Sequence, residues 1–123
     1  MQLLDSSIWL AHLVDAHNKA SELMEKDEML FCSILSLFEI EKKLRRDKYP
    51  EEKIEKMISF MTGRSIIINL TENIVRKSAK ISIQYELAAV DALIYATAME
   101  QNLILITADN DFRGLPNTEI IDK

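Results

Sequence analysis

Short apolar runs alternate with longer amphipathic stretches along most of this chain. The apolar runs are rich in Leu and Ile and predict strands at residues 2–4, 29–32, 66–68 and 103–106, with an edge strand at 118–121. The stretches between them predict helices at residues 6–13, 17–25, 34–46, 50–61, 71–84 and 91–101. Because strands separated by helices favour a parallel sheet covered on both faces, the pattern predicts an α/β fold.

Residues that favour helix ends support several of these boundaries. Ser6 or Ser7 is available to cap the first helix, and Thr71 stands where a later helix opens. Pro50 suits the first turn of the fourth helix, and Gly63 is predicted to end it.

Length and composition fit one domain spanning residues 1–123. Hydrophobic residues make up 48% of the chain, which is enough for a packed interior. A run of about 18 apolar residues is absent, and so is a basic segment followed by an apolar one, so we expect neither a membrane span nor a signal peptide. The single Cys32 is expected to be a small core residue, which points weakly to a reducing cytoplasm.

The net charge of −5 argues against broad, nonspecific coating of nucleic acid. It does not exclude an enzyme that acts on nucleic acid, because the acids can be concentrated where a metal ion binds. No glycine-rich phosphate loop is present, so binding of nucleoside triphosphates is not expected.

Four carboxylates, far apart in the sequence, stand where a predicted strand stops or where a helix begins: Asp5, Glu39, Asp91 and Asp109. Ligands of open α/β sheets bind outside the carboxyl ends of the strands. Acids that converge there repel one another unless a cation or a proton neutralises some of them. Oxygen-only clusters suit Mg²⁺ or Mn²⁺, and such sites commonly serve phosphoryl chemistry.

Each acid also has a simpler interpretation. Asp5 can cap the helix that follows it, and Asp91 can serve as an N-cap or as a partner of the helix dipole. The segment 109–111 can be an ordinary turn, since Asp and Asn favour turns. The apolar residues at 88–90 favour a functional role for Asp91, because a shielded carboxylate is costly unless it is paired or bound to metal.

Helical periodicity does not single out Glu39. The apolar residues of the 34–46 helix centre a stripe near Glu41, whereas Glu39 lies toward its other side. Periodicity alone therefore favours Glu41 as the unusual inward acid, or makes both acids solvated partners of Lys42 and Lys43.

The four acids lie in segments of distinctive composition: apolar residues followed by Asp5-Ser6-Ser7, the Ser-rich segment 33–39, Asp91-Ala92-Leu93-Ile94-Tyr95-Ala96-Thr97-Ala98, and Thr107-Ala108-Asp109-Asn110-Asp111-Phe112. The third is close to Asp-x-x-Ile-x-Ala-x-Ala and the fourth to Thr-x-Asp-x-Asp-Phe. In this order and spacing they resemble the motifs of PIN-domain nucleases, most closely the VapC-type toxin ribonucleases of toxin–antitoxin pairs. The resemblance covers essentially the whole chain.

The resemblance implies a three-layer α/β/α sandwich and a ribonuclease that uses Mg²⁺ or Mn²⁺ to hydrolyse RNA phosphodiesters. It implies that the metal-binding acids are Asp5, Glu39, Asp91 and Asp109, with Asp111 as a fifth candidate, and so selects Glu39 over Glu41. Ser7 and Thr107 are implied as neighbours that orient acids or bound water through hydrogen bonds. An antitoxin protein is the implied partner. The family usually has a Gly shortly after the second acid, where this chain has residues 43–45, Lys-Leu-Arg.

Substrate binding needs positive charge, which is densest at residues 42–48 and recurs at 76–80, although a solvated helix face is the commoner role of such a basic segment. Arg113, next to the fourth acid, is a candidate contact to RNA phosphate. Trp9 and Tyr95 can stack on bases, although core positions are the commoner role of such residues. His12 and His17 are expected to be surface or partly packed residues rather than catalytic groups.

Helices 34–44 and 54–61 carry apolar residues, including Met57 and Met61, that predict a homodimer and further contact surface for an antitoxin. The alternative is that they fill the core of the monomer. Two other functions stay open: a binding or scaffold protein with little nuclease activity, and a metal-dependent phosphohydrolase of small molecules.

Overall fold

The computed structural model describes residues 1–15 and 17–122, and its centre is a five-stranded parallel sheet. The strand order is β3-β2-β1-β4-β5, and each neighbouring pair is parallel. The strands are β1 (Gln2–Leu4), β2 (Leu30–Ser33), β3 (Ser65–Ile68), β4 (Ile104–Thr107) and β5 (Thr118–Ile120). The predicted parallel sheet is confirmed, and the strand boundaries differ from the predicted ones by one residue or less.

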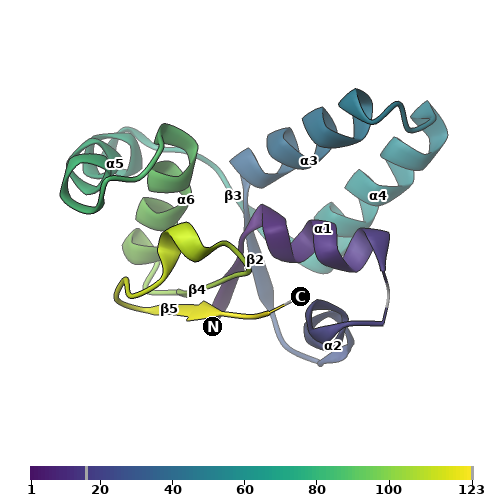
Figure 1. Ribbon diagram of the computed structural model, residues 1–123, viewed down its shortest axis with the longest axis horizontal. Coiled ribbons are helices and arrows are strands. Elements are labelled where there is room, and N and C mark those ends of the chain that lie inside the picture. The colour runs from purple at the N-terminus through teal and green to yellow at the C-terminus, as the bar shows by residue number, and fades with distance from the viewer. Residues whose placement is uncertain (16, 123) are drawn as a thin grey trace.

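Helices cover both faces of the sheet, as Figure 1 shows. They are α1 (Ser6–Val14), α2 (Lys19–Glu25), α3 (Ile34–Arg46), α4 (Glu51–Arg64), α5 (Glu72–Tyr85) and α6 (Ala89–Glu100), and a 3₁₀ turn η1 (Asn110–Phe112) follows β4. The first four helices lie on the right of the view, and α5 and α6 lie on the left. The expected three-layer α/β/α arrangement is therefore confirmed.

Two hydrophobic clusters occupy the two faces of the sheet. Leu4 and Cys32 pack with residues of α1, α2, α3 and α4, whereas Leu3 and Leu105 pack with residues of α6. This division follows from strand geometry, because successive side chains of a strand point to opposite faces. Cys32 is completely buried, and burial raises the pKa of its thiol to about 12, as expected for a core residue.

The strand order reverses its direction at β1, which lies between β2 and β4. In open α/β sheets, ligands bind at the carboxyl ends of the strands beside such a reversal. Asp5 follows β1 directly, and its backbone N–H donates to the carbonyl of Ile106 in β4 at 2.9 Å. The ends of β1 and β4 are thus joined, and the residues that follow them share one edge of the sheet.

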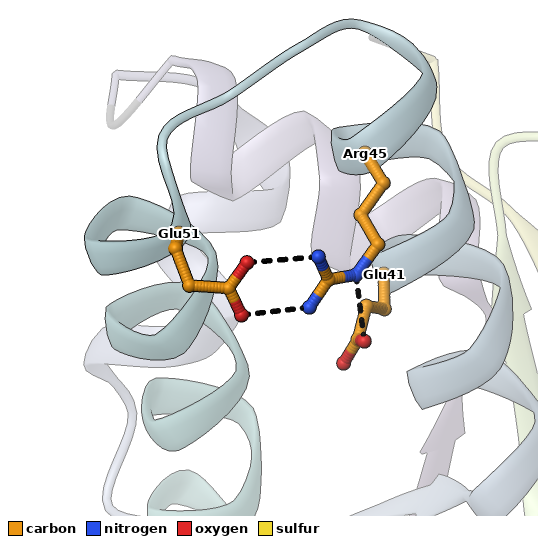
Figure 2. Close-up of polar contacts among 3 residues, drawn as sticks. All are labelled: Glu41, Arg45 and Glu51. Atoms are coloured by element: carbon orange, nitrogen blue, oxygen red, sulfur yellow. Dashed lines mark hydrogen bonds and ion pairs between the residues drawn. The ribbon is translucent and has the colours of Figure 1, made fainter.

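Helices α3 and α4 form a hairpin that projects from the body of the protein (Figure 1). Across this hairpin, the Arg45 guanidinium donates two hydrogen bonds of 2.8 Å to the Glu51 carboxylate and one of 2.9 Å to Glu41 (Figure 2). The three side chains are exposed to solvent, so the ion pairs add little stability. They do, however, fix Arg45 and Glu41 on the α4 side of α3.

Two predicted helix ends are wrong. Gly63 does not end α4, which continues through Arg64. The Arg64 guanidinium donates to the backbone carbonyls of Met24, Lys26 and Glu28, and these bonds hold the last turn of α4 against the end of α2. Ser6 and Ser7 do not cap α1 but lie within its first turn, where their hydroxyls bond to acidic side chains.

The apolar residues of α4 mostly fill the core. Met61 and Ile54 are buried and Met57 packs against the same cluster, so the expectation that Met61 belongs to a contact surface is wrong. In the described part of the chain, no helix has both the length and the apolar character that crossing a bilayer requires.

Candidate metal centre

Asp5 is a buried carboxylate at the end of β1, with only 3% of its surface exposed. Its Oδ2 accepts a hydrogen bond of 2.8 Å from the Ser7 hydroxyl and one of 2.7 Å from the Thr107 hydroxyl. Although Asp5 occupies the N-cap position of α1, its side chain makes no capping hydrogen bond. Two hydroxyl donors therefore compensate for the burial of this carboxylate, and the capping interpretation is wrong.

Ser7 and Thr107 also bind the backbone that follows β4. The Ser7 hydroxyl accepts from the N–H of Ala108 at 2.9 Å, and the Thr107 hydroxyl accepts from the N–H of Asp109 at 3.0 Å. Each hydroxyl thus donates to Asp5 and accepts from this backbone. Ser7 and Thr107 therefore hold Asp5 and Asp109 at fixed positions relative to each other.

Thr107→Val is expected to lower the free energy of unfolding by about 1–3 kcal/mol, because it removes one of the two close hydroxyl donors to Asp5 and the acceptor of the Asp109 N–H. Urea denaturation of the metal-free protein measures the change. Thr107→Ser, which keeps the hydroxyl, should recover most of the loss. Equal stability of the Val variant and the wild type would show that this hydroxyl does not support the buried acid.

Glu39 lies at the edge of the buried face of α3. This helix is capped by Ser33, and it buries Ser36, Ile40 and Leu44. Glu39 is half-buried beside this face, and its Oε1 accepts a hydrogen bond of 3.0 Å from the Ser6 hydroxyl. The structure therefore places Glu39 beside Asp5.

Glu41 lies on another side of α3, where it pairs with Arg45 (Figure 2). The apolar stripe pointed to Glu41 because it included Ile34, Leu37 and Phe38, none of which is fully buried, whereas the buried face of α3 runs through Ser36, Ile40 and Leu44. In the structure 57% of the Phe38 surface is exposed.

Asp91, Asp109 and Asp111 bring their carboxylate oxygens within 4.8 Å of one another. Asp91 lies in the first turn of α6, and Asp109 is the N-cap of η1. The Asp109 Oδ1 accepts from the N–H of Asp111 at 2.9 Å, so the predicted turn is present and also brings these two acids together.

One cleft of about 380 Å³ joins the acids of four separate segments. Its lining includes Asp5, Glu39, Asp91 and Asp109, together with Ser6 and Ser7. Asp111 is more exposed and adjoins this group through Asp91 and Asp109. One wall is basic, because α3 contributes Lys42, Lys43 and Arg46 to the same cleft.

Burial, together with the neighbouring acids, raises the pKa of two of these carboxylates. Burial raises the pKa of Asp91 to about 6, and the charges of Asp5, Asp109, Glu39 and Asp111 act in the same direction. Burial also raises the pKa of Glu39, and the charges of Asp5 and Asp109 add to the rise, while the Ser6 hydrogen bond and the Lys42 charge oppose it. Both acids are thus held in an environment that favours a proton or a cation.

Comparison with protein-family models decides the family, since the model described as PIN domain matches residues 3–117. The chain belongs to the PIN domain family. Its fold is that of VapC-like toxins, as comparison with solved structures shows. Comparison with curated proteins gave no match.

Three solved structures illustrate the likeness of this PIN domain to toxin proteins. A chain in a toxin–antitoxin complex from Klebsiella pneumoniae is 25% identical, with a TM-score of 0.83 and 100% of both chains covered. A chain of VapBC2 from Rickettsia felis, bound to a promoter DNA fragment, is 19% identical, with a TM-score of 0.80; the match covers 98% of this chain and 97% of that one. VapC20 from Mycobacterium tuberculosis, a sarcin-ricin loop cleaving toxin, is 17% identical, with a TM-score of 0.75; the match covers 94% of this chain and 95% of that one.

The oxygen donors of this PIN domain fit a divalent metal ion. Ligands about 2.1 Å from one Mg²⁺ lie within about 4.2 Å of one another. The oxygens of Asp91, Asp109 and Asp111 are within 4.8 Å, so small side-chain rotations would bring them to this distance. A donor set made only of carboxylates matches the preference of Mg²⁺ and Mn²⁺ for oxygen.

The stability of the metal-free PIN domain should depend on the Asp91 charge in a defined pH range. In the unfolded chain Asp91 loses its proton near the ordinary value of 3.8, whereas the folded protein retains it until about pH 6. Since the folded state binds more protons in this range, Asp91 lowers the stability as the pH rises from about 4 to about 6, and the loss persists above it.

Asp91→Asn should therefore become more stable than the wild type across this range, as thermal melts in EDTA would show. Asp27→Asn, at an exposed loop position, is the matched control. A stability difference between Asp91→Asn and wild type that does not change from pH 4 to 6 would contradict the raised pKa.

Several other predicted residues lie outside the cleft. Arg113 is exposed and donates to the Asn110 side chain at 3.1 and 2.7 Å. His12 is half-buried and bonds to the Ser21 hydroxyl at 2.9 Å, and His17 is exposed. The lining of the cleft includes none of Arg113, His12 and His17.

Trp9 and Tyr95 are buried in the core, which is the role expected to be the commoner one, so neither is available to stack on bases. Sequence reasoning missed the exposed aromatic residue of the cleft, Phe38, and the hydrogen bond from Ser6 to Glu39. Phe38 directly precedes the second acid, and this position was the available signal.

Proposed function

We propose that this PIN-domain protein is a divalent-metal-dependent ribonuclease that hydrolyses RNA phosphodiester bonds. The observation that carries the proposal is the convergence of Asp5, Glu39, Asp91 and Asp109 in one cleft beside the reversal of strand order. Such a concentration of charge costs stability unless cations neutralise it.

The acids divide into groups with different roles. Asp91, Asp109 and Asp111 form the tight group that would hold Mg²⁺ or Mn²⁺. When bound, such an ion lowers the pKa of water and stabilises charge on a phosphate. Asp5, fixed by Ser7 and Thr107, supplies a rigid negative charge from the floor of the cleft.

Glu39 lies outside the tight group of three acids but within the cleft. Its raised pKa suits it to receive a proton from the attacking water, since a general base works best when its pKa is near the operating pH. The Ser6 hydroxyl orients the carboxylate for this role.

A polyanionic substrate agrees with the basic wall of the cleft. Although the net charge is −5, Lys42, Lys43 and Arg46 line the same cleft as the acids. Contacts to several phosphates favour RNA over a small phosphate ester. Arg113, at the end of η1, is proposed as a further phosphate contact.

We also propose that the protein is the toxin of a toxin–antitoxin pair in the cytoplasm, because the Klebsiella and Rickettsia structures are complexes of this kind. A homodimer remains a prediction. Exposed apolar residues on α5, Val75 and Ile83, are consistent with a further contact surface.

Cleavage assays test the enzymatic proposal. The wild type should cleave RNA with Mg²⁺ or Mn²⁺, should lose this activity in EDTA, and should leave simple nucleotide esters intact. Hydrolysis of the esters without cleavage of RNA would support a small-molecule phosphohydrolase instead. Inactivity on every RNA, combined with tight binding to the product of an adjacent gene, would support a scaffold protein.

A further inference from the structure

We propose that Phe38, Lys42 and Arg46 form a binding subsite for single-stranded RNA, in which a nucleobase next to the scissile phosphate stacks on Phe38 and the backbone follows the two cations. This inference rests on the proposed ribonuclease function and names the form of RNA that the cleft accepts. The three residues are called the α3 row below.

The α3 row forms part of the lining of the acid cleft. Its members recur every four residues, so they lie on one side of the helix, and the row spans about 12 Å at a rise of about 1.5 Å per residue. All three line the same cleft as Asp5, Asp91 and Asp109. A strand that follows the row therefore passes directly beside the acids.

Phe38 presents an aromatic ring to solvent at the mouth of this cleft. Large aromatic residues are usually buried, as Trp9 and Tyr95 are here, whereas 57% of Phe38 is exposed. The Lys42 ammonium lies 5.7 Å from the centre of the ring, within the range of a cation–π contact. An exposed ring beside a cation is the combination that single-strand-binding proteins use to stack a base and hold its phosphate.

The cations of the α3 row are available for a ligand, whereas other cations of the helix are not. Arg45 is held by Glu41 and Glu51 on the side facing α4 (Figure 2), and Lys43 pairs with Asp47 at 3.0 Å. Within residues 1–15 and 17–122, neither Lys42 nor Arg46 makes an ion pair with an acidic side chain. Their charges can therefore neutralise phosphates.

The arrangement favours a single strand over a duplex. A base can stack on the Phe38 ring only when it is unpaired and turned out of its own stack. One row of cations on one helix also matches the backbone of one strand. An apolar segment of a protein partner is the competing occupant, since Phe38 also borders a hollow lined by Ile34, Leu37 and Ile58.

Binding of a short single-stranded RNA, followed by fluorescence anisotropy in an Asp91→Asn background, tests the proposal. Phe38→Ala and Phe38→Leu should weaken binding by roughly tenfold, whereas Phe38→Trp should retain it. Ile83→Ala, which removes an exposed apolar side chain from α5, should have no effect. In the active protein, the same Phe38 variants should raise KM more than they lower kcat.

Salt dependence tests the cations separately. Arg46→Gln should reduce the slope of log affinity against log salt by about 0.7, the expected loss of one phosphate contact to a single strand. Arg76→Gln makes the same chemical change at an exposed position on α5 and should leave the slope unchanged.

Three outcomes would overturn the subsite. If the wild type cleaves RNA and Phe38→Leu binds it as tightly as the parent, the subsite is absent while the ribonuclease function stands. The subsite is also absent, and the ribonuclease function still stands, if Phe38→Leu weakens binding of the antitoxin protein but not of RNA. If the wild type cleaves no RNA in Mg²⁺ or Mn²⁺, the ribonuclease function itself fails.

Discussion

Asp91→Asn should reduce metal-dependent cleavage of RNA by at least about a hundredfold. Asp91 is the acid whose pKa is raised to about 6 by burial and by the four other carboxylates, so it stands where their negative charge is concentrated. Removing one charge would weaken the hold on the proposed cation, which would stabilise the transition state, and single electrostatic contacts of this kind contribute roughly a hundredfold to a thousandfold in rate. Gel analysis of single-turnover cleavage measures the loss.

Asp27→Asn is the control, because Asp27 is an exposed acid in the loop between α2 and β2. It makes the same change of charge and should keep the activity of the wild type. Asp91→Asn should be more stable than the metal-free wild type above pH 6, so a loss of activity would reflect chemistry and not unfolding. Cleavage by Asp91→Asn at the rate of the wild type would contradict a metal site formed by Asp91, Asp109 and Asp111.

The rates of RNA cleavage by Glu39→Gln and Glu41→Gln are expected to differ by a factor as large as that between Asp91→Asn and the wild type. Glu39 lines the cleft beside Asp5 and accepts the Ser6 hydrogen bond, whereas Glu41 pairs with Arg45 in solvent. Glu39→Gln should abolish metal-dependent cleavage, while the melting temperature without metal stays the same or rises because one repelling charge is gone. Glu41→Gln should leave cleavage within a few-fold, since exposed ion pairs add little.

The two substitutions control for each other, because they make the same chemical change two residues apart on one helix. Loss of activity in Glu41→Gln alone would mean that the second acid is misassigned. Full activity in both variants would argue against the ribonuclease function.

The sequence predicted the sheet and two of the acids through simple physical rules. Strands and helices alternate clearly enough to predict a parallel sheet, and Asp5 and Asp109 follow its strands closely. Ends of parallel strands meet at one edge, so these two acids could be placed together without a structure. Asp91 was identified by the apolar residues that precede it, and in the folded protein burial does raise its pKa, although Ala88 and Ala89 are themselves exposed.

Features that depend on tertiary packing could not be predicted from periodicity. Phe38 widened the apparent apolar stripe of α3 although it faces solvent, and the stripe left out Ser36, a polar residue that belongs to the buried face of the helix. The resemblance to PIN-domain nucleases, rather than the pattern, selected Glu39. Gly63 was expected to end α4, but contacts from Arg64 to the end of α2 extend the helix.

Calorimetric titration of Mn²⁺ into the metal-free protein tests the central claim most directly, because it measures metal binding without any assumption about the RNA. The wild type and Asp27→Asn should bind the ion with the same affinity, and Asp91→Asn should bind it at least about tenfold more weakly, since one of three clustered oxygen donors has lost its charge. Affinities that are equal in all three proteins, or the absence of binding to the wild type, would contradict the metal centre.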